Sequence, residues 1–171
     1  MTATAVFTAL LCILAPMSVP IGPVPISLTN LVIYLSLYIL GMKKGTISYL
    51  LYMLIGIIGL PVFSGFTGGP AKLLGPTGGY LVGFIFITLM GGFVIERLKE
   101  KYILHFAAFV VSTAVCYAFG TVWFVYLMKC TFAYALTVCV FPFIIVDLCK
   151  MILAIIFGNI IRKRLVSAKL I

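Results

Sequence analysis

Two ionisable side chains, Asp147 and Lys150, stand out because they interrupt a long apolar stretch near the end of the chain. They are three positions apart, which places them on one face of a helix. A charged side chain that faces lipid near the bilayer centre costs about 3 kcal/mol on insertion scales. The pair is therefore expected to face the interior of a helix bundle or to lie near an interface. It either fastens the last helix or forms a polar site for a small ligand, and we favour the ligand site.

A glycine-rich loop over residues 59–80 supports the ligand interpretation. It contains seven glycines and three prolines, together with the aromatic side chains of Phe63, Phe66 and Tyr80. Glycine and proline permit tight turns that leave backbone N–H and C=O groups accessible. The loop is mostly apolar and carries the basic residue Lys72, whereas a flexible linker would be richer in serine and charge. We interpret it as a lid or pocket wall rather than a linker.

A second loop, over residues 16–30, contains four prolines. Prolines favour an extended backbone, so this loop is expected to be stiff. It ends in hydrogen-bonding side chains that include Ser27, Thr29 and Asn30. These residues either begin the next helix in the ordinary way or contact a ligand, and the sequence leaves both readings open.

The composition places these features in a membrane. Hydrophobic residues make up 64% of the 171 residues and charged residues 9%, with a mean hydropathy of +1.32. Soluble domains carry about a quarter charged residues, so the apolar side chains here must face lipid as well as one another. We predict a single all-α membrane domain over residues 1–171 with six transmembrane helices, and with the glycine-rich loop outside, between the third and fourth. The six apolar segments cover residues 3–15, 28–40, 46–60, 79–94, 103–127 and 142–161.

The basic residues indicate the orientation of these helices. If both termini are cytoplasmic, nine of the twelve Lys and Arg residues lie inside, while Lys72 and Lys129 lie outside and Lys150 falls within the last span. This asymmetry follows the positive-inside rule. The net charge of +9 does not indicate nucleic-acid binding, because no basic face interleaved with aromatic residues is present. The nine inner residues are Lys43, Lys44, Arg97, Lys99, Lys101, Arg162, Lys163, Arg164 and Lys169.

Sequence motifs for catalysis and for metal binding are absent. The chain has no phosphate-binding loop, nucleophile elbow or zinc-protease helix, and its three acidic residues leave few candidates for paired-carboxylate chemistry. Its five cysteines include no C-x-x-C pair, and the single histidine, His105, is expected at an interface rather than as a metal ligand. We therefore expect no enzyme, cofactor or metal. The first segment has no basic n-region, so we also expect no cleaved signal.

Pairs of small residues four positions apart occur in two of the segments. Ala5 and Ala9 lie in the first segment, and Gly79 and Gly83 open the fourth. Such spacing lets a second helix approach closely. The pattern is common by chance, and packing within the chain explains it as well as a partner helix does.

The order of several motifs resembles the BioY family, the substrate-binding S components of energy-coupling factor (ECF) transporters for biotin. The similarity runs over nearly the whole chain, and Gly-Pro-Thr-Gly-Gly-Tyr with the upstream Pro-Val-Phe is its most specific part. Where many members carry Thr-Leu-Gln after the proline loop, this chain has Ser27-Leu28-Thr29. The similar stretches are Pro23-Val-Pro-Ile-Ser-Leu, Gly59-Leu-Pro-Val-Phe-Ser-Gly, Leu74-Gly-Pro-Thr-Gly-Gly-Tyr-Leu-Val-Gly-Phe, and Pro142-Phe with Asp147-x-x-Lys150.

The resemblance implies a six-helix protein of the cell membrane that captures biotin from outside. It also implies docking, through Ala5 and Ala9, on a transmembrane coupling subunit served by two cytoplasmic ATPases. In such a site Asp147 would accept hydrogen bonds from the ureido N–H groups of biotin, and Lys150 would pair with its carboxylate. The alternatives are another carboxylated vitamin such as lipoate, or a structural membrane subunit. The further ligand contacts expected from the resemblance are Asn30, Phe63, Phe66, Gly75, Thr77 and Tyr80.

Overall fold

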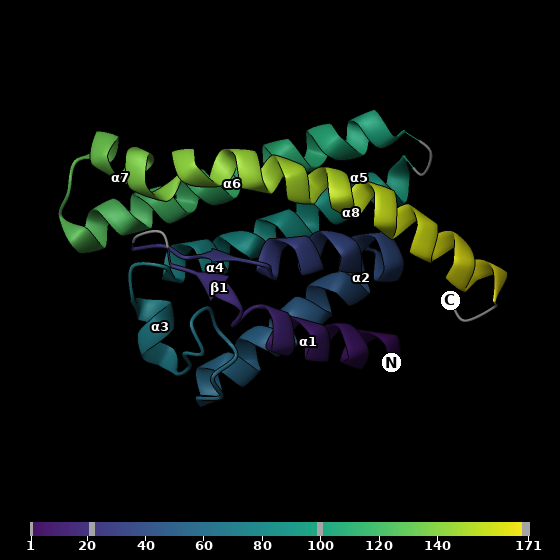
Figure 1. Ribbon diagram of the computed structural model, residues 1–171, viewed down its shortest axis with the longest axis horizontal. Helices are drawn as coiled ribbons and strands as arrows, with labels where there is room; N and C mark the ends of the chain where they lie inside the picture. The colour runs from purple at the N-terminus through teal and green to yellow at the C-terminus, as the bar shows by residue number, and fades with distance from the viewer. Residues whose placement is uncertain (1, 21–22, 99–100, 169–171) are drawn as a thin grey trace.

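The computed structural model describes residues 2–20, 23–98 and 101–168, and helices account for most of them (Figure 1). A two-stranded antiparallel sheet, β1 (Ser18–Val19) with β2 (Ile26–Ser27), pairs Ser18 with Ser27. These two short strands are the only strands within the described residues, so the fold is mostly helical, as predicted. The helices in chain order are α1 (Thr2–Leu14), α2 (Thr29–Ile58), α3 (Pro70–Leu74), α4 (Gly78–Phe86), the π-helix η1 (Ile87–Gly91), α5 (Gly92–Arg97), α6 (Tyr102–Met128), α7 (Phe132–Cys139) and α8 (Phe141–Ser167).

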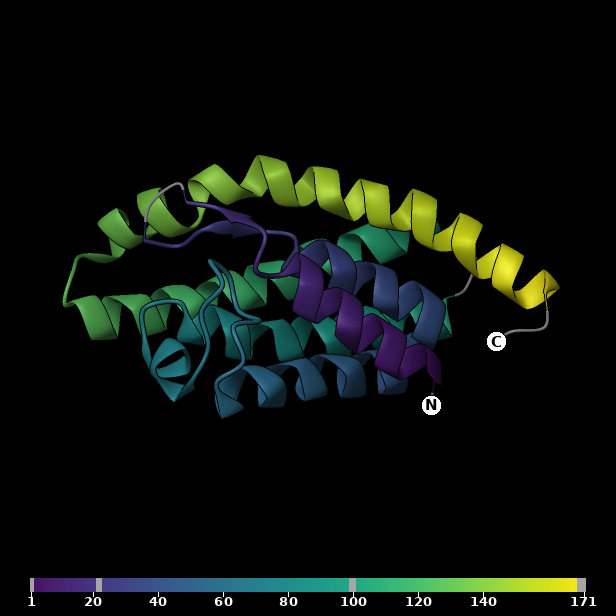
Figure 2. The same ribbon diagram turned by 60° about the horizontal axis from the view of Figure 1, so that its bottom comes forward.

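The long helix α2 is broken at Gly41, where the chain reverses its direction (Figures 1 and 2). Gly41 has φ 79° and ψ 179°, a backbone conformation that residues other than glycine rarely adopt. The second half then needs a new N-terminal cap, and the Glu96 carboxylate provides one by accepting a hydrogen bond from the Met42 N–H at 2.7 Å. Residues 29–40 and 42–58 thus form two helices that run in opposite senses.

The six apolar segments predicted from the sequence all form helix. Segments 3–15, 103–127 and 142–161 match α1, α6 and α8, although α8 continues to Ser167. Segments 28–40 and 46–60 match the two halves of α2, and segment 79–94 matches the continuous run α4–η1–α5. Among the described residues, three helices are long and apolar enough to cross a membrane: Gly78–Arg97, Tyr102–Met128 and Phe141–Ser167.

The helices give the molecule two distinct ends (Figures 1 and 2). The start of α1, the reversal at Gly41 and the end of α8 lie at one end, which we call the terminal end. The β1–β2 pair, α3 and α7 lie at the other, which we call the loop end. Seven of the nine basic residues assigned to the inner side belong to segments at the terminal end, and the remaining two, Lys99 and Lys169, lie outside the described residues.

Glycines allow α4 and α6 to pack closely. A Cβ atom at Gly79 would lie 2.4 Å from Cβ of Trp123, and one at Gly83 would lie 2.7 Å from Sγ of Cys116. From the other side, a Cβ atom at Gly120 would lie 2.3 Å from the Tyr80 ring. The Gly79 and Gly83 pair therefore serves packing within the chain. The sequence had left this role and contact with a partner helix as equal alternatives.

Loss of the Glu96 side chain is expected to weaken the helix reversal. Glu96→Ala removes the acceptor for the Met42 N–H and should lower the free energy of unfolding by about 0.5–2 kcal/mol, the usual cost of a lost N-cap. Glu96→Gln keeps a side-chain oxygen acceptor and should retain most of the stability. Thermal unfolding of the full chain in detergent measures both, and equal losses for the two variants would contradict the capping role.

Candidate functional site

The first three turns of α8 position the pair that the sequence singled out. Pro142 lies at the start of this helix, where its missing N–H costs no hydrogen bond. Asp147 and Lys150 follow on the inward face and are 5% and 6% exposed. Both therefore face the interior of the bundle, which is one of the two positions that the sequence allowed.

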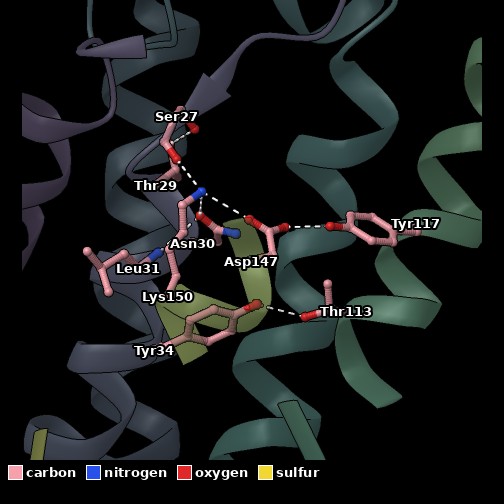
Figure 3. Close-up of polar contacts among 9 residues, drawn as sticks. All are labelled: Ser27, Thr29, Asn30, Leu31, Tyr34, Thr113, Tyr117, Asp147 and Lys150. Atoms are coloured by element: carbon pink, nitrogen blue, oxygen red, sulfur yellow. Dashed lines mark hydrogen bonds and ion pairs between the residues drawn. The ribbon is translucent and has the colours of Figure 1, made fainter. Parts of the chain in front are cut away.

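Lys150 has a protein acceptor for each of its three N–H donors (Figure 3). Its Nζ lies 2.8 Å from the carbonyl oxygen of Ser27, 2.9 Å from Oδ1 of Asn30 and 3.0 Å from Oδ1 of Asp147. These acceptors come from β2, the first turn of α2 and α8. One ammonium group therefore joins three segments that are far apart in the sequence.

The carboxylate of Asp147 extends the same network to α6 (Figure 3). Its second oxygen, Oδ2, accepts a hydrogen bond from the Tyr117 hydroxyl at 2.5 Å. One helical turn earlier on α6, Thr113 shares a 2.7 Å hydrogen bond with the Tyr34 hydroxyl of α2. Two polar layers thus hold α2, α6 and α8 together around the pair. The contacts of Lys150 and Asp147 are charge-assisted and therefore stronger than the neutral hydrogen bond between Tyr34 and Thr113.

Two small cavities of about 50 Å³ each adjoin this network. The first is bordered by Asn30, Tyr117, Asp147 and Lys150. The second is bordered by hydroxyl side chains, among them those of Tyr52, Ser64 and Thr77. The two have walls in common, so they form neighbouring polar spaces beneath the loop end. The residues that border both are Val24, Pro25, Ser27, Tyr80 and Phe84.

Tyr52 gives the second cavity an unsatisfied polar group. Its side chain is completely buried, and its hydroxyl is the one buried side-chain nitrogen or oxygen atom, among the residues that the structure describes, that has no hydrogen-bond partner. A buried hydroxyl without a partner is unfavourable by about 1–3 kcal/mol. Since Tyr52 borders the cavity, a ligand oxygen or nitrogen there would supply the missing partner.

The structure brings together five of the eight ligand contacts predicted from the sequence. Asn30, Asp147 and Lys150 border the first cavity, Thr77 borders the second and Tyr80 borders both. The other three, which are Phe63, Phe66 and Gly75, are not among the residues that border either cavity.

Those three residues, and Lys72, have other surroundings. Phe63 is fully buried and its ring packs edge-on against Tyr52 at 5.6 Å. Phe66 is 67% exposed, and the carbonyl of Gly75 accepts a hydrogen bond from the Trp123 indole at 3.0 Å. Lys72 is half-buried on α3, where desolvation lowers the pKa of its ammonium group. The glycine-rich loop therefore contributes Ser64, Thr77 and Tyr80 to the borders of the two cavities.

Sequence reasoning missed Tyr52 and Tyr117. Each is one tyrosine within a long apolar helix, and nothing in its spacing distinguishes it from the other seven tyrosines of the chain. His105 was expected at an interface, but it is 1% exposed, and its ring lies between the Tyr38 hydroxyl at 2.9 Å and the Leu98 carbonyl at 2.8 Å. Within the described residues no group of three His, Cys, Asp or Glu side chains could hold a metal ion.

Comparison with known proteins assigns the chain to a family. A model described as the BioY family matches residues 1–167. The chain belongs to the BioY family. The biotin transporter BioY of Thermotoga maritima is 39% identical over 158 residues, which cover 92% of each chain. BioY2 of Lactococcus lactis is 35% identical over 158 residues, 92% of this chain and 87% of its own.

A solved S component for biotin shares the fold. The crystal structure of the S component for biotin from an ECF-type ABC transporter superposes with a TM-score of 0.88 at 32% identity, covering 95% of this chain and 89% of that one. The resemblance inferred from the sequence motifs is thus confirmed. With these transporter relatives and its long apolar helices, this BioY family member is a multi-pass membrane protein.

The buried pair is expected to behave as one unit in stability measurements. Lys150→Met leaves the Asp147 carboxylate buried without its cation and should lower the free energy of unfolding by about 3–5 kcal/mol. Combining it with Asp147→Asn should cost less than the sum of the two single changes, because no unpaired charge then remains. Unfolding in detergent, with the exposed Lys129→Met as control, measures this coupling. Additive losses would contradict it.

Proposed function

We propose that this protein is the biotin-binding S component of an ECF-type importer, which captures biotin from outside and delivers it through an ATPase-driven module. The main support is the buried Asp147–Lys150 pair, which adjoins two polar cavities in a BioY family chain. Its relatives are named biotin transporters, and the solved structure that it resembles is an S component for biotin. No catalytic step is assigned to the chain.

The polar groups of the site match the two ends of biotin. The ligand has a carboxylate at the end of its tail and a ureido ring with two N–H donors and one carbonyl. Lys150 would bind the carboxylate and Asp147 would accept from a ureido N–H, as the sequence suggested. The hydroxyl of Tyr52 would donate to a ligand oxygen in the second cavity. Phe84 and Tyr80 lie between the two cavities, where an apolar thiophane ring needs packing surface.

Ligand binding in these two cavities requires them to widen, because each holds only about 50 Å³ and drug-sized ligands occupy pockets of about 300–1,000 Å³. Val24, Pro25 and Ser27 form the wall that both cavities share, and Lys150 holds this wall through the Ser27 carbonyl. A ligand carboxylate that binds Lys150 would replace one of its protein acceptors. We infer that ligand binding loosens β2 from α8. The position of β2 would then depend on whether the site holds a ligand.

Six membrane crossings with both termini in the cytoplasm remain our proposal for the topology. The two halves of α2 supply two crossings, and α1, α4–η1–α5, α6 and α8 supply the others. The common position of the start of α1 and the end of α8 supports this arrangement (Figure 1), as does the concentration of basic residues at the terminal end. The loop end would then face the outside, where biotin enters.

The outer face of α1 is the proposed contact with the coupling subunit. Ala5 and Ala9 are both exposed, whereas Thr8 and Leu11 of the same helix face the bundle. Thr8 fastens that inner face through a 3.1 Å hydrogen bond to Ser48. The exposed alanines leave room for close approach by a second helix, and two cytoplasmic ATPase subunits would drive that partner.

Biotin binding to the purified protein tests the function. Isothermal titration should show tight binding, which Asp147→Asn and Lys150→Ala should weaken. Tyr52→Phe should weaken binding about fivefold to tenfold without loss of stability, because the hydroxyl has no protein partner to lose. Tyr126→Phe, at a tyrosine that is 79% exposed, is the matched control and should bind normally.

Lipoate serves as the competing ligand in the same experiment, because it carries a carboxylate tail but no ureido ring. A binding heat with lipoate and none with biotin would show that the substrate is another carboxylated vitamin. Binding of neither ligand, together with unfolding of the Asp147 and Lys150 variants, would support a purely structural pair instead.

Bulky substitutions on α1 test the docking face. Ala5→Leu or Ala9→Leu should reduce co-purification with the coupling subunit about tenfold, since overpacking costs about 1–3 kcal/mol, while biotin binding stays intact. Ala107→Leu, at an exposed alanine of α6, is the control and should leave the complex unchanged. Survival of the complex in both α1 variants would refute this assignment.

A further inference from the structure

A third, larger cavity lies at the terminal end, far from the pair in α8. It has a volume of about 460 Å³ and is bordered by residues of α2, α5, α6 and α8. Arg162, Lys163 and Asn159 line it from the last turns of α8, and Tyr38 and His105 form its inner wall. Arg162 lies fifteen residues after Asp147, or about 22 Å along the helix. The two sites are therefore separate.

The positive charge of this cavity has no acidic partner among the described residues. The structure describes two acidic side chains: Asp147 lies at the loop end, and Glu96 caps the Met42 N–H. Neither is among the residues that border the cavity. Arg162 is half-buried and Lys163 is exposed. Like charges that lie side by side repel each other, so an anionic ligand would stabilise the arrangement.

The inner wall holds the guanidinium group in place. Nε2 of His105 donates to the Leu98 carbonyl at 2.8 Å, which leaves Nδ1 to accept from the Tyr38 hydroxyl at 2.9 Å. The carbonyl of Tyr38 in turn accepts a hydrogen bond from Nη1 of Arg162 at 3.2 Å. This contact uses one of five guanidinium N–H donors. The others, with the Lys163 ammonium and the Asn159 amide, are suited to a phosphate group, whose oxygens match the fork of an arginine.

We propose that this cavity binds the phosphate of an anionic phospholipid headgroup at the cytoplasmic side of the membrane. A cavity of about 460 Å³ exceeds the size of a phosphate ion and accommodates its glycerol ester as well. Apolar side chains at the rim, including the 54%-exposed Val166 and the ring of Tyr102, continue towards the lipid-facing surface. Basic pockets between helices at this level bind the headgroups of anionic lipids. Soluble phosphate esters share the recognised chemistry, and the experiment separates the two sources.

Native mass spectrometry of the full chain, titrated with phosphatidylglycerol or phosphatidylcholine, tests this site. The wild-type protein should retain phosphatidylglycerol in preference to phosphatidylcholine. Arg162→Gln and Lys163→Gln should each lower the apparent affinity for phosphatidylglycerol about fivefold, the usual contribution of one cation near an anionic headgroup. Arg164→Gln removes the same charge from the same helix, but Arg164 does not border the cavity, so this control should bind like the wild type.

Three results would overturn the proposal. They are equal retention of the two lipids, equal losses in the control and the cavity variants, and binding of sn-glycerol 3-phosphate in place of lipid, which would assign the cavity to a soluble ester. Lys163→Gln keeps the test independent of folding, because the Lys163 side chain makes no hydrogen bond within the described part of the chain, whereas Arg162 holds Tyr38. Biotin binding should be unchanged in all three variants, so failure here leaves the proposed transport function standing.

Discussion

The need to satisfy a buried ammonium group organises this protein. Lys150 lies in an apolar bundle where an unpaired charge would be prohibitively unfavourable, and it obtains three acceptors from β2, α2 and α8. Asp147, the counter-ion, accepts a hydrogen bond from Tyr117 and so connects the network to α6. Each acceptor constrains the segment that supplies it. The arrangement of four segments around the loop end therefore follows from one cation and its counter-ion.

The apolar parts of the fold serve this network by close packing. In a lipid environment helices gain little from hydrophobic burial against one another, so they depend on shape and on small residues. Gly79, Gly83 and Gly120 bring α4 against α6 and thereby place Tyr80 beside the polar cavities. The reversal at Gly41, capped by Glu96, returns the second half of α2 towards the loop end and places Tyr52 there. Close helix packing and the helix reversal thus place the polar side chains of Tyr80 and Tyr52 at the cavities.

The two ends of the molecule use charge in opposite ways. At the loop end the cation is balanced within the protein, so a ligand anion that binds Lys150 would replace an acceptor that is already in place. At the terminal end the cations of α8 exceed the acidic groups that the structure describes around them. The first arrangement favours a selective site for a small carboxylated molecule, and the second favours an anion supplied by the surroundings.

The sequence by itself determined the membrane class, the six helical segments, the family and the inward-facing pair. These features depend on composition, on periodicity and on the cost of charge in lipid, which are local or additive. Only the tertiary structure decided that Asn30 is an acceptor for Lys150, that Tyr52 and Tyr117 join the site, and that Phe63 and Phe66 do not border its cavities. Those outcomes depend on contacts between segments up to 120 positions apart. No spacing rule within one helix specifies which side chains from different helices meet.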